Sequence, residues 1–186
     1  MFSIEKCAIP INTLLADYSI DGNYTDCYTT EVRGPISFPE YVFAFYTTLL
    51  FRLERLILKV AVSKPSTDNE ARQLSEGASE TFAAWQVESR SKNELLMCDF
   101  RGRTRSWLMV APVSAVDGHR TRLYFGSVVV PVQNSKTGKP SLGLVYRALL
   151  GFHIVYSVLL LYSARLRIQS QVTDKMKRNR STYERR

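Results

Sequence analysis

One set of side chains that could recognise a ligand lies on a predicted strand, residues 103–110. Because side chains alternate between the two faces of a strand, Arg105 and Trp107 share one face. An arginine in a cavity wall could bind the carboxylate or phosphate group of a ligand. The structural alternative is an exposed arginine, or one paired with an acid such as Asp99 or Glu88. The position beside a hairpin favours this alternative.

A second set lies on the last long apolar run of the chain. If Arg147 and Arg165, about five helical turns apart, mark the solvent side, the opposite side is apolar. That side carries Val145, Leu149, Phe152, Tyr156 and Leu160, with His153 on its flank. Tyr156 and His153 would be the polar groups of an apolar ligand pocket, and Tyr124 is a further candidate for its lining. The alternative, which the lack of a visible partner acid favours, is a core histidine bonded to its neighbours.

No motif in the sequence identifies a reaction. The chain lacks a GxSxG nucleophile elbow, an HExxH zinc pair and a dinucleotide-binding GxGxxG. Residues 135–141, SKTGKPS, resemble a phosphate loop only superficially, because the first glycine is missing and proline follows the lysine. Cys7, Cys27 and Cys98 have neither disulfide nor zinc spacing. The sequence therefore predicts no metal and no cofactor, and it favours a protein without catalytic activity.

The elements that must position these side chains begin with a strand and a helix. Residues 26–32 are rich in β-branched and aromatic residues, which predicts the strand. Ser37 and Glu40 have the spacing of a capping box, and we expect the helix that they begin to run to about residue 62. Its apolar stripe, at three- and four-residue steps, is predicted to face the core. The stripe comprises Val42, Tyr46, Leu49, Leu50, Leu53, Ile57 and Val60.

The second half of the chain predicts a meander of strands and a final helix. A short helix ends at Gly77, and from residue 81 to 131 the apolar period is two, with turns short enough to join antiparallel neighbours. Residues 142–168 then predict a long helix, whose 17 residues between Arg147 and Arg165 carry no fixed charge. Because a membrane span needs about 20 apolar residues, this uncharged stretch is short for crossing a membrane. The order of elements is α+β and is that of the helix-grip fold, in which a curved antiparallel sheet wraps the last helix.

Length and composition predict one domain with two extensions. We expect an N-terminal arm over residues 1–25, the helix-grip domain over 26–169, and a basic, disordered tail over 170–186.

Several separated segments also resemble a known family. They are FYTTLLFRLERLILKV, KPSTDNEARQL, FAAWQVESR, GRTRSWLMV, TRLYFGSVVVP and ALLGFHIVYSVLLL. Together they resemble an uncharacterised bacterial domain-of-unknown-function family of the DUF2867 type, over roughly residues 25–168. That family is similar to the helix-grip START and birch-pollen-allergen superfamily (SRPBCC). The resemblance implies a cavity for an apolar small molecule between sheet and helix, and it brings no substrate or catalytic residues with it.

The net charge of +8 is concentrated at the C-terminal end, where residues 165–186 hold eight Lys and Arg against two Asp and Glu. Such a segment attracts anionic surfaces without sequence specificity, so no specific nucleic acid is predicted. The nominal solvent face of the last helix is also apolar at Ile154, Val158 and Leu161, which predicts a second copy or a membrane surface as partner. Because the N-terminus lacks a signal-peptide pattern, we expect a cytoplasmic protein, with or without peripheral contact to the inner membrane.

Three functional hypotheses follow. The first is non-catalytic binding of a hydrophobic or amphipathic, lipid-like molecule between the sheet and the C-terminal helix, lined by Arg105, Trp107, Tyr124, Leu149, His153 and Tyr156. The second is an enzyme in the same cavity, with His153 as acid or base and Arg105 as anion stabiliser, which requires the two side chains to converge. The third is an interaction module that uses the outer face of the helix and the basic tail.

Overall fold

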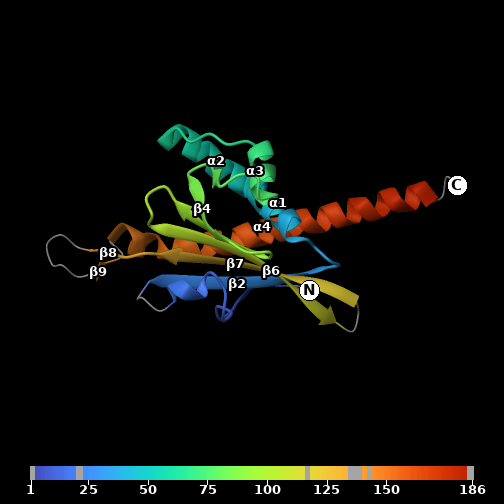
Figure 1. The fold of residues 1–186 in the computed structure, drawn as a ribbon, viewed down its shortest axis with the longest axis horizontal. Coiled ribbons are helices and arrows are strands. Elements are labelled where there is room, and N and C mark those ends of the chain that lie inside the picture. Colours follow the sequence, from blue (N-terminus) through green and yellow to red (C-terminus); the bar gives the residue numbers. More distant parts are fainter. Residues whose placement is uncertain (1–2, 20–22, 116–117, 134–139, 142–143, 184–186) are drawn as a thin grey trace.

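An antiparallel sheet of seven strands organises the described part of the chain, and helices pack on one of its faces (Figure 1). The computed structural model describes residues 3–19, 23–115, 118–133, 140–141 and 144–183. In order across the sheet, the strands are β1 (Glu5–Lys6), β2 (Tyr24–Arg33), β7 (Gly118–Val129), β6 (Thr104–Ala115), β5 (Glu94–Asp99), β4 (Trp85–Arg90) and β3 (Thr81–Phe82). The helices are α1 (Phe38–Tyr46), α2 (Leu49–Val62), α3 (Asp68–Ser75) and α4 (Leu144–Tyr183), with a 3₁₀ turn over Ala16–Tyr18. Two further strands, β8 (Val132–Gln133) and β9 (Pro140–Ser141), pair with each other.

The sheet confirms the predicted α+β architecture and the antiparallel meander. β4, β5, β6 and β7 are sequential antiparallel neighbours, joined by the short turns that the sequence predicts. β2 closes the order by pairing with β7, so that Tyr28 lies opposite Phe125. The first long strand, β2, therefore lies beside the last long strand, β7. Along the chain, β8 and β9 follow β7, and α4 comes next.

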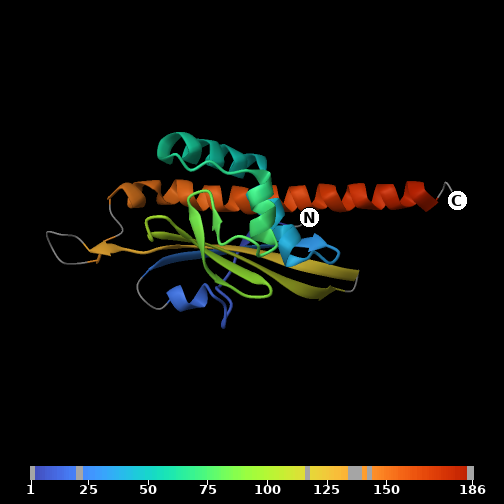
Figure 2. The ribbon, with the colours of Figure 1, turned by 45° about the horizontal axis from the view of Figure 1, so that its top comes forward.

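The two faces of the sheet are covered by different parts of the chain (Figure 2). On the face that we call the helix face, α1 and α4 pack on buried side chains that include Val32, Leu108, Leu123 and Phe125. On the opposite face, here called the arm face, residues 3–19 bring Leu15 onto Cys27, Leu96, Trp107, Met109 and Val128. The N-terminal arm is thus a structural layer that completes a second, smaller core.

Gly126 on β7 permits the close approach of the arm. A Cβ atom at this position would collide with the side chain of Leu15 and lie 3.1 Å from the Trp107 ring. The absence of a side chain here lets Leu15 reach the sheet, where it is fully buried.

The helix predicted over residues 38–62 is interrupted at Thr47 and Thr48. Its start is as predicted, because Ser37 and Glu40 form a complete capping box. α1 then ends at Tyr46, and the Thr48 hydroxyl caps a new helix by accepting the backbone N–H of Phe51 at 3.1 Å. A threonine side chain at this position satisfies one of the free N–H groups of a helix start, which the apolar pattern alone does not reveal.

The break changes the rotation of α2, so that Leu50 packs against the core as predicted, whereas the other members of the predicted stripe beyond Tyr46 are exposed. Leu49 and Val60 are 83% and 78% exposed, and Leu53 and Ile57 are also exposed. The buried side of α2 instead carries Arg55, whose guanidinium bonds to Asp68 at 2.7 Å and to Ser66 at 2.9 Å. Phe51 and this paired arginine form the buried side of α2, and the apolar stripe of the helix faces outward.

α4 differs from the predicted helix in its rotation and in its length. Arg165, predicted to mark the solvent side, is buried, and so are Leu160 and Ile168. Leu161, predicted to face outward, is fully buried, whereas Val158 is half-buried and Ile154 exposed. Packing against α1 and β2 fixes this rotation, and the outward stripe is Val155, Leu159, Tyr162 and Leu166.

The helix also passes the boundary predicted at residue 169. It continues through the basic segment to Tyr183, where a disordered tail was predicted from residue 170 (Figure 1). Within the described residues, no helix has both the length and the apolarity that crossing a membrane requires.

Candidate functional site

A cavity of about 180 Å³ lies between the helix face of the sheet and the helices α2 and α4. We call it the α4 cavity. Its lining comprises Phe45, Phe51, Glu54, Trp85, Thr104, Arg105, Ser106, Phe125, Ser127, Tyr156, Ser157 and Leu160. The position agrees with the sequence prediction of a cavity between the sheet and the last helix.

The floor of the cavity is a row of small hydroxyl side chains on β6 and β7. Ser106 and Ser127 are directly paired across the two strands, and both are buried. Alternation along each strand places Ser106 with Leu108, and Ser127 with Phe125, on the helix face. Small side chains at these two positions leave the space that larger apolar residues fill elsewhere on this face.

The roof of the cavity carries one carboxyl and one phenol that bond to each other. The Tyr156 hydroxyl of α4 donates to the Glu54 carboxylate of α2. Burial raises the pKa of Glu54 above its ordinary value, and hydrogen bonds from Tyr156 and Trp85 partly oppose that shift. Burial and the neighbouring Glu54 carboxylate also raise the pKa of Tyr156. The pair therefore favours a neutral phenol and a carboxyl that gains a proton more readily than an exposed one.

Ser157 contributes a buried hydroxyl that has no hydrogen-bond partner among the described residues. Its side chain is 1% exposed and belongs to the cavity lining. Burying a hydroxyl without a partner costs about 1–3 kcal/mol, so a group that bonds to Ser157 would be stabilised there.

The lining suits recognition of a small amphipathic molecule. Aromatic rings from Phe45, Phe51 and Phe125 supply flat apolar walls, and the hydroxyls with Glu54 supply donors and acceptors. The described lining contains no histidine, cysteine or lysine that could serve as a nucleophile or as a conventional acid–base partner of Glu54. No group of three metal-ligating side chains occurs among the described residues either.

Of the predicted lining residues, Tyr156 and Arg105 border the cavity, and Leu160, on the same predicted helix face as Tyr156, also lines it. The side chains of Leu149 and His153 lie outside those that the structure describes.

Arg105 borders the cavity through its strand, but its side chain lies on the arm face. Its Nε donates to Glu88 at 3.1 Å, and its guanidinium lies 5.0 Å from the centre of the Tyr18 ring. The pairing with Glu88 is the structural alternative that the sequence had already favoured. Arg105 therefore borders the cavity as predicted, but its guanidinium is paired with Glu88, and its role as an anion-binding group stays a prediction.

Trp107 and Tyr124 were also predicted on the wrong face. Both pack in the arm-face core, with ring centres 6.1 Å apart. The Trp107 indole N–H donates to Glu94 at 2.9 Å, and that carboxylate also accepts the backbone N–H of Leu14. Trp107 thus anchors the N-terminal arm, and neither ring lies in the α4 cavity.

The sequence reasoning missed Glu54, Ser106, Ser127 and Ser157. One signal was available, because alternation on residues 103–110 separates Ser106 from Trp107 and so offers a hydroxyl face as the alternative inward face. Glu54 gave no such signal, since it belongs to a helix whose apolar stripe faces outward.

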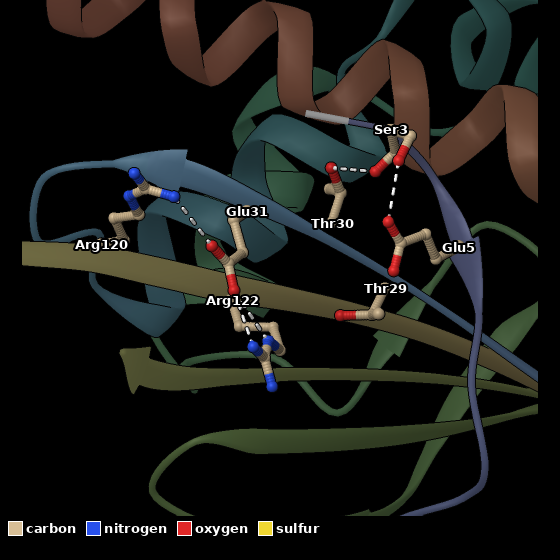
Figure 3. A pocket seen from close by; sticks show the side chains of 7 residues that line it. All are labelled: Ser3, Glu5, Thr29, Thr30, Glu31, Arg120 and Arg122. Carbon is tan, nitrogen blue, oxygen red and sulfur yellow. Dashed lines mark hydrogen bonds and ion pairs between the residues drawn. The ribbon is translucent and has the colours of Figure 1, made fainter. Parts of the chain in front are cut away.

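A larger pocket, of about 340 Å³, lies at the edge of the sheet beside β1. Figure 3 shows Glu31 between two arginines, 3.4 Å from Arg120 and 2.7 Å from Arg122. Hydrogen bonding to Arg122 lowers the pKa of Glu31, which stays ionised. With Glu5, the charges of this lining sum to zero, so an ionic ligand would have to break existing pairs. We therefore regard this pocket as a structural ion-pair cluster.

The comparisons with known proteins add no relative. No family model matches the chain, and no curated protein is significantly similar to it. The resemblance to the DUF2867-type family stays a prediction.

Proposed function

We propose that the protein binds a small, uncharged, amphipathic molecule in the α4 cavity. The observation that carries this proposal is the buried hydroxyl of Ser157, a residue of the cavity lining, which has no partner among the described residues. A ligand with one hydroxyl or amide group would supply that partner, while its apolar part would contact the aromatic walls.

The size of the cavity narrows the class of ligand. Pockets for drug-sized molecules have about 300–1,000 Å³, whereas an engineered cavity of about 150 Å³ holds benzene. At about 180 Å³, the α4 cavity has room for one ring with a polar substituent. The lipid-like ligand expected from the sequence is too large for this volume, unless only part of it enters.

The arrangement of elements supports the same proposal. One long strand, helices, a meander and a last helix that packs on the sheet follow one another in the order of the helix-grip fold. We infer that the chain is a helix-grip protein, and proteins of this superfamily hold apolar ligands in the corresponding place. This inference also agrees with the family resemblance of the sequence.

A binding role is better supported than catalysis. The enzymatic hypothesis needs His153 and Arg105 to converge, but the Arg105 guanidinium is held by Glu88 on the opposite face of the sheet. Glu54 and Tyr156 remain in the cavity as a bonded pair, which is able to orient a ligand without a reaction.

Isothermal titration calorimetry with p-cresol, and with toluene as its apolar analogue, tests the proposal. We expect p-cresol to bind with a dissociation constant of roughly 0.1–1 mM, and toluene about tenfold more weakly, because it cannot bond to Ser157 or Glu54. Ser157→Leu should fill the cavity and abolish binding, whereas Ser170→Leu, at an exposed site on the same helix, should not change it. Equal binding by both variants would place the probe elsewhere and overturn the proposal.

A further inference from the structure

Two helices display apolar stripes on the outer surface of the protein. The stripe of α2 comprises Leu49, Leu53, Leu56, Ile57 and Val60, and all five are more than half exposed. The stripe of α4 comprises Val155, Leu159, Tyr162 and Leu166, with Val155 57% exposed. Figures 1 and 2 show the two helices side by side on the helix side of the molecule. An apolar surface of this extent marks a contact with something other than water.

The excess of positive over negative charge lies in two segments of the chain, residues 49–62 and 165–186. Residues 49–62 contain three basic residues (Lys or Arg) and one acidic residue (Asp or Glu), and residues 165–186 contain eight basic and two acidic residues. The remainder of the chain holds fourteen of each and is neutral. The segment counts sum to the net charge of +8, but α2 contributes little of it, because Arg52 and Arg55 both pair with Asp68. The excess comes chiefly from residues 165–186, which end and continue α4.

Apolar side chains beside excess positive charge match the chemistry of an anionic lipid surface. Helices that lie in a membrane interface bury such a stripe at the headgroup level while Lys and Arg attract the anionic headgroups. A second copy of this protein matches less well, because pairing the same face would oppose two positive charge clusters. Nucleic acid would use the charge but would leave the leucines in water.

We propose that the face formed by α2 and α4 docks on an anionic membrane surface. The protein would lie on the bilayer, with the leucines of α2 and the outer stripe of α4 at headgroup depth. The basic end of α4, helical to Tyr183, would extend along the surface. This docking is independent of the α4 cavity and of any ligand in it.

Vesicle flotation of the full chain tests the docking. We expect binding to vesicles of phosphatidylcholine with 30% phosphatidylglycerol, little binding to phosphatidylcholine alone, and loss of binding in high salt. Leu53→Glu with Ile57→Glu should lower the partition coefficient at least about tenfold, because charged side chains cannot enter the interface. The matched control is Ile11→Glu, at an 86% exposed position on the arm, which should leave binding unchanged. Circular dichroism and thermal unfolding verify that each variant is folded.

A second pair of measurements separates the alternatives. Lys177→Ala with Arg180→Ala should weaken vesicle binding about 25-fold at low salt, at roughly fivefold per charge. Sedimentation velocity should show a wild-type monomer. A wild-type dimer that the Leu53 and Ile57 variant dissociates would overturn the proposal and identify the face as a self-association surface. Equal binding of the wild type and that variant to anionic vesicles would also overturn it.

Discussion

Removing the Ser157 hydroxyl should stabilise the protein in the absence of ligand. Most serine-to-alanine changes in a core are expected to be neutral or unfavourable, but this hydroxyl is 1% exposed and has no partner among the described residues. Relief of its desolvation should contribute about 1–2 kcal/mol, and the better helix propensity of alanine about 0.5 kcal/mol. For a chain of this size, about 2 kcal/mol corresponds to a rise in Tm of roughly 4–8 °C.

Urea denaturation followed by circular dichroism measures this change, with Ser170→Ala as the control. Ser170 is exposed on the same helix, so its replacement should contribute only the propensity difference of about 0.5 kcal/mol. The increase in the free energy of unfolding caused by Ser157→Ala should therefore exceed that caused by Ser170→Ala by at least about 1 kcal/mol. If the two variants are equally stable, or if Ser157→Ala is the less stable one, the hydroxyl is already satisfied. The reasoning that assigns it to a ligand would then be refuted.

Further predictions concern other parts of the structure. Burial raises the pKa of Glu54, so the folded state favours its protonated form, and its contribution to stability falls as the pH rises above 4.5. The stability of Glu54→Gln relative to wild type should consequently be greater at pH 7.5 than at pH 4, as urea titrations at both values would show. The Sγ atoms of Cys7 and Cys27 lie 3.1 Å apart, so two-electron oxidation by diamide should join them, leaving one thiol that iodoacetamide alkylates after unfolding. Leu161→Ala should cost about 2–5 kcal/mol because Leu161 is fully buried, whereas Ile154→Ala should cost less than about 1 kcal/mol, and equal costs would contradict the observed rotation of α4.

Local patterns predicted most elements of the fold correctly. The period-two segments are the strands of a meander, and the capping box at Ser37 and Glu40 begins a helix. Such signals are local, so they can be read without knowing what packs where. The division of the first long helix at Thr48 was not predicted, because a threonine cap inside an apolar stripe resembles an ordinary helical position.

Which side of each strand or helix faces the core was harder to predict than where the strand or helix occurs in the sequence. Periodicity separates Trp107 from Ser106, but only tertiary packing decides which of them meets the last helix. Trp107 lies on the arm face because it packs with Leu15 and donates a hydrogen bond to Glu94, and both residues are distant from it in sequence. On α4, buried Arg165 misled the choice of the solvent side, since a charge normally faces water.

The consequences for the site follow from these two errors. A cavity under the last helix was predicted and is present, with Tyr156 in its lining. Trp107 and Tyr124 were assigned to it by a strand face that proves to be the opposite one, whereas Arg105 does border it. Strand alternation offered a signal for Ser106, whereas Glu54, Ser127 and Ser157 come from positions that carry no distinguishing pattern in one sequence.

A crystal structure of the protein grown with 4-bromophenol tests the central claim most directly. The account predicts an anomalous bromine peak inside the α4 cavity, with the phenol hydroxyl within hydrogen-bond distance of Ser157 or Glu54 and the ring against Phe125. A cavity that contains only water, or that is closed by the surrounding side chains at saturating 4-bromophenol, would contradict it.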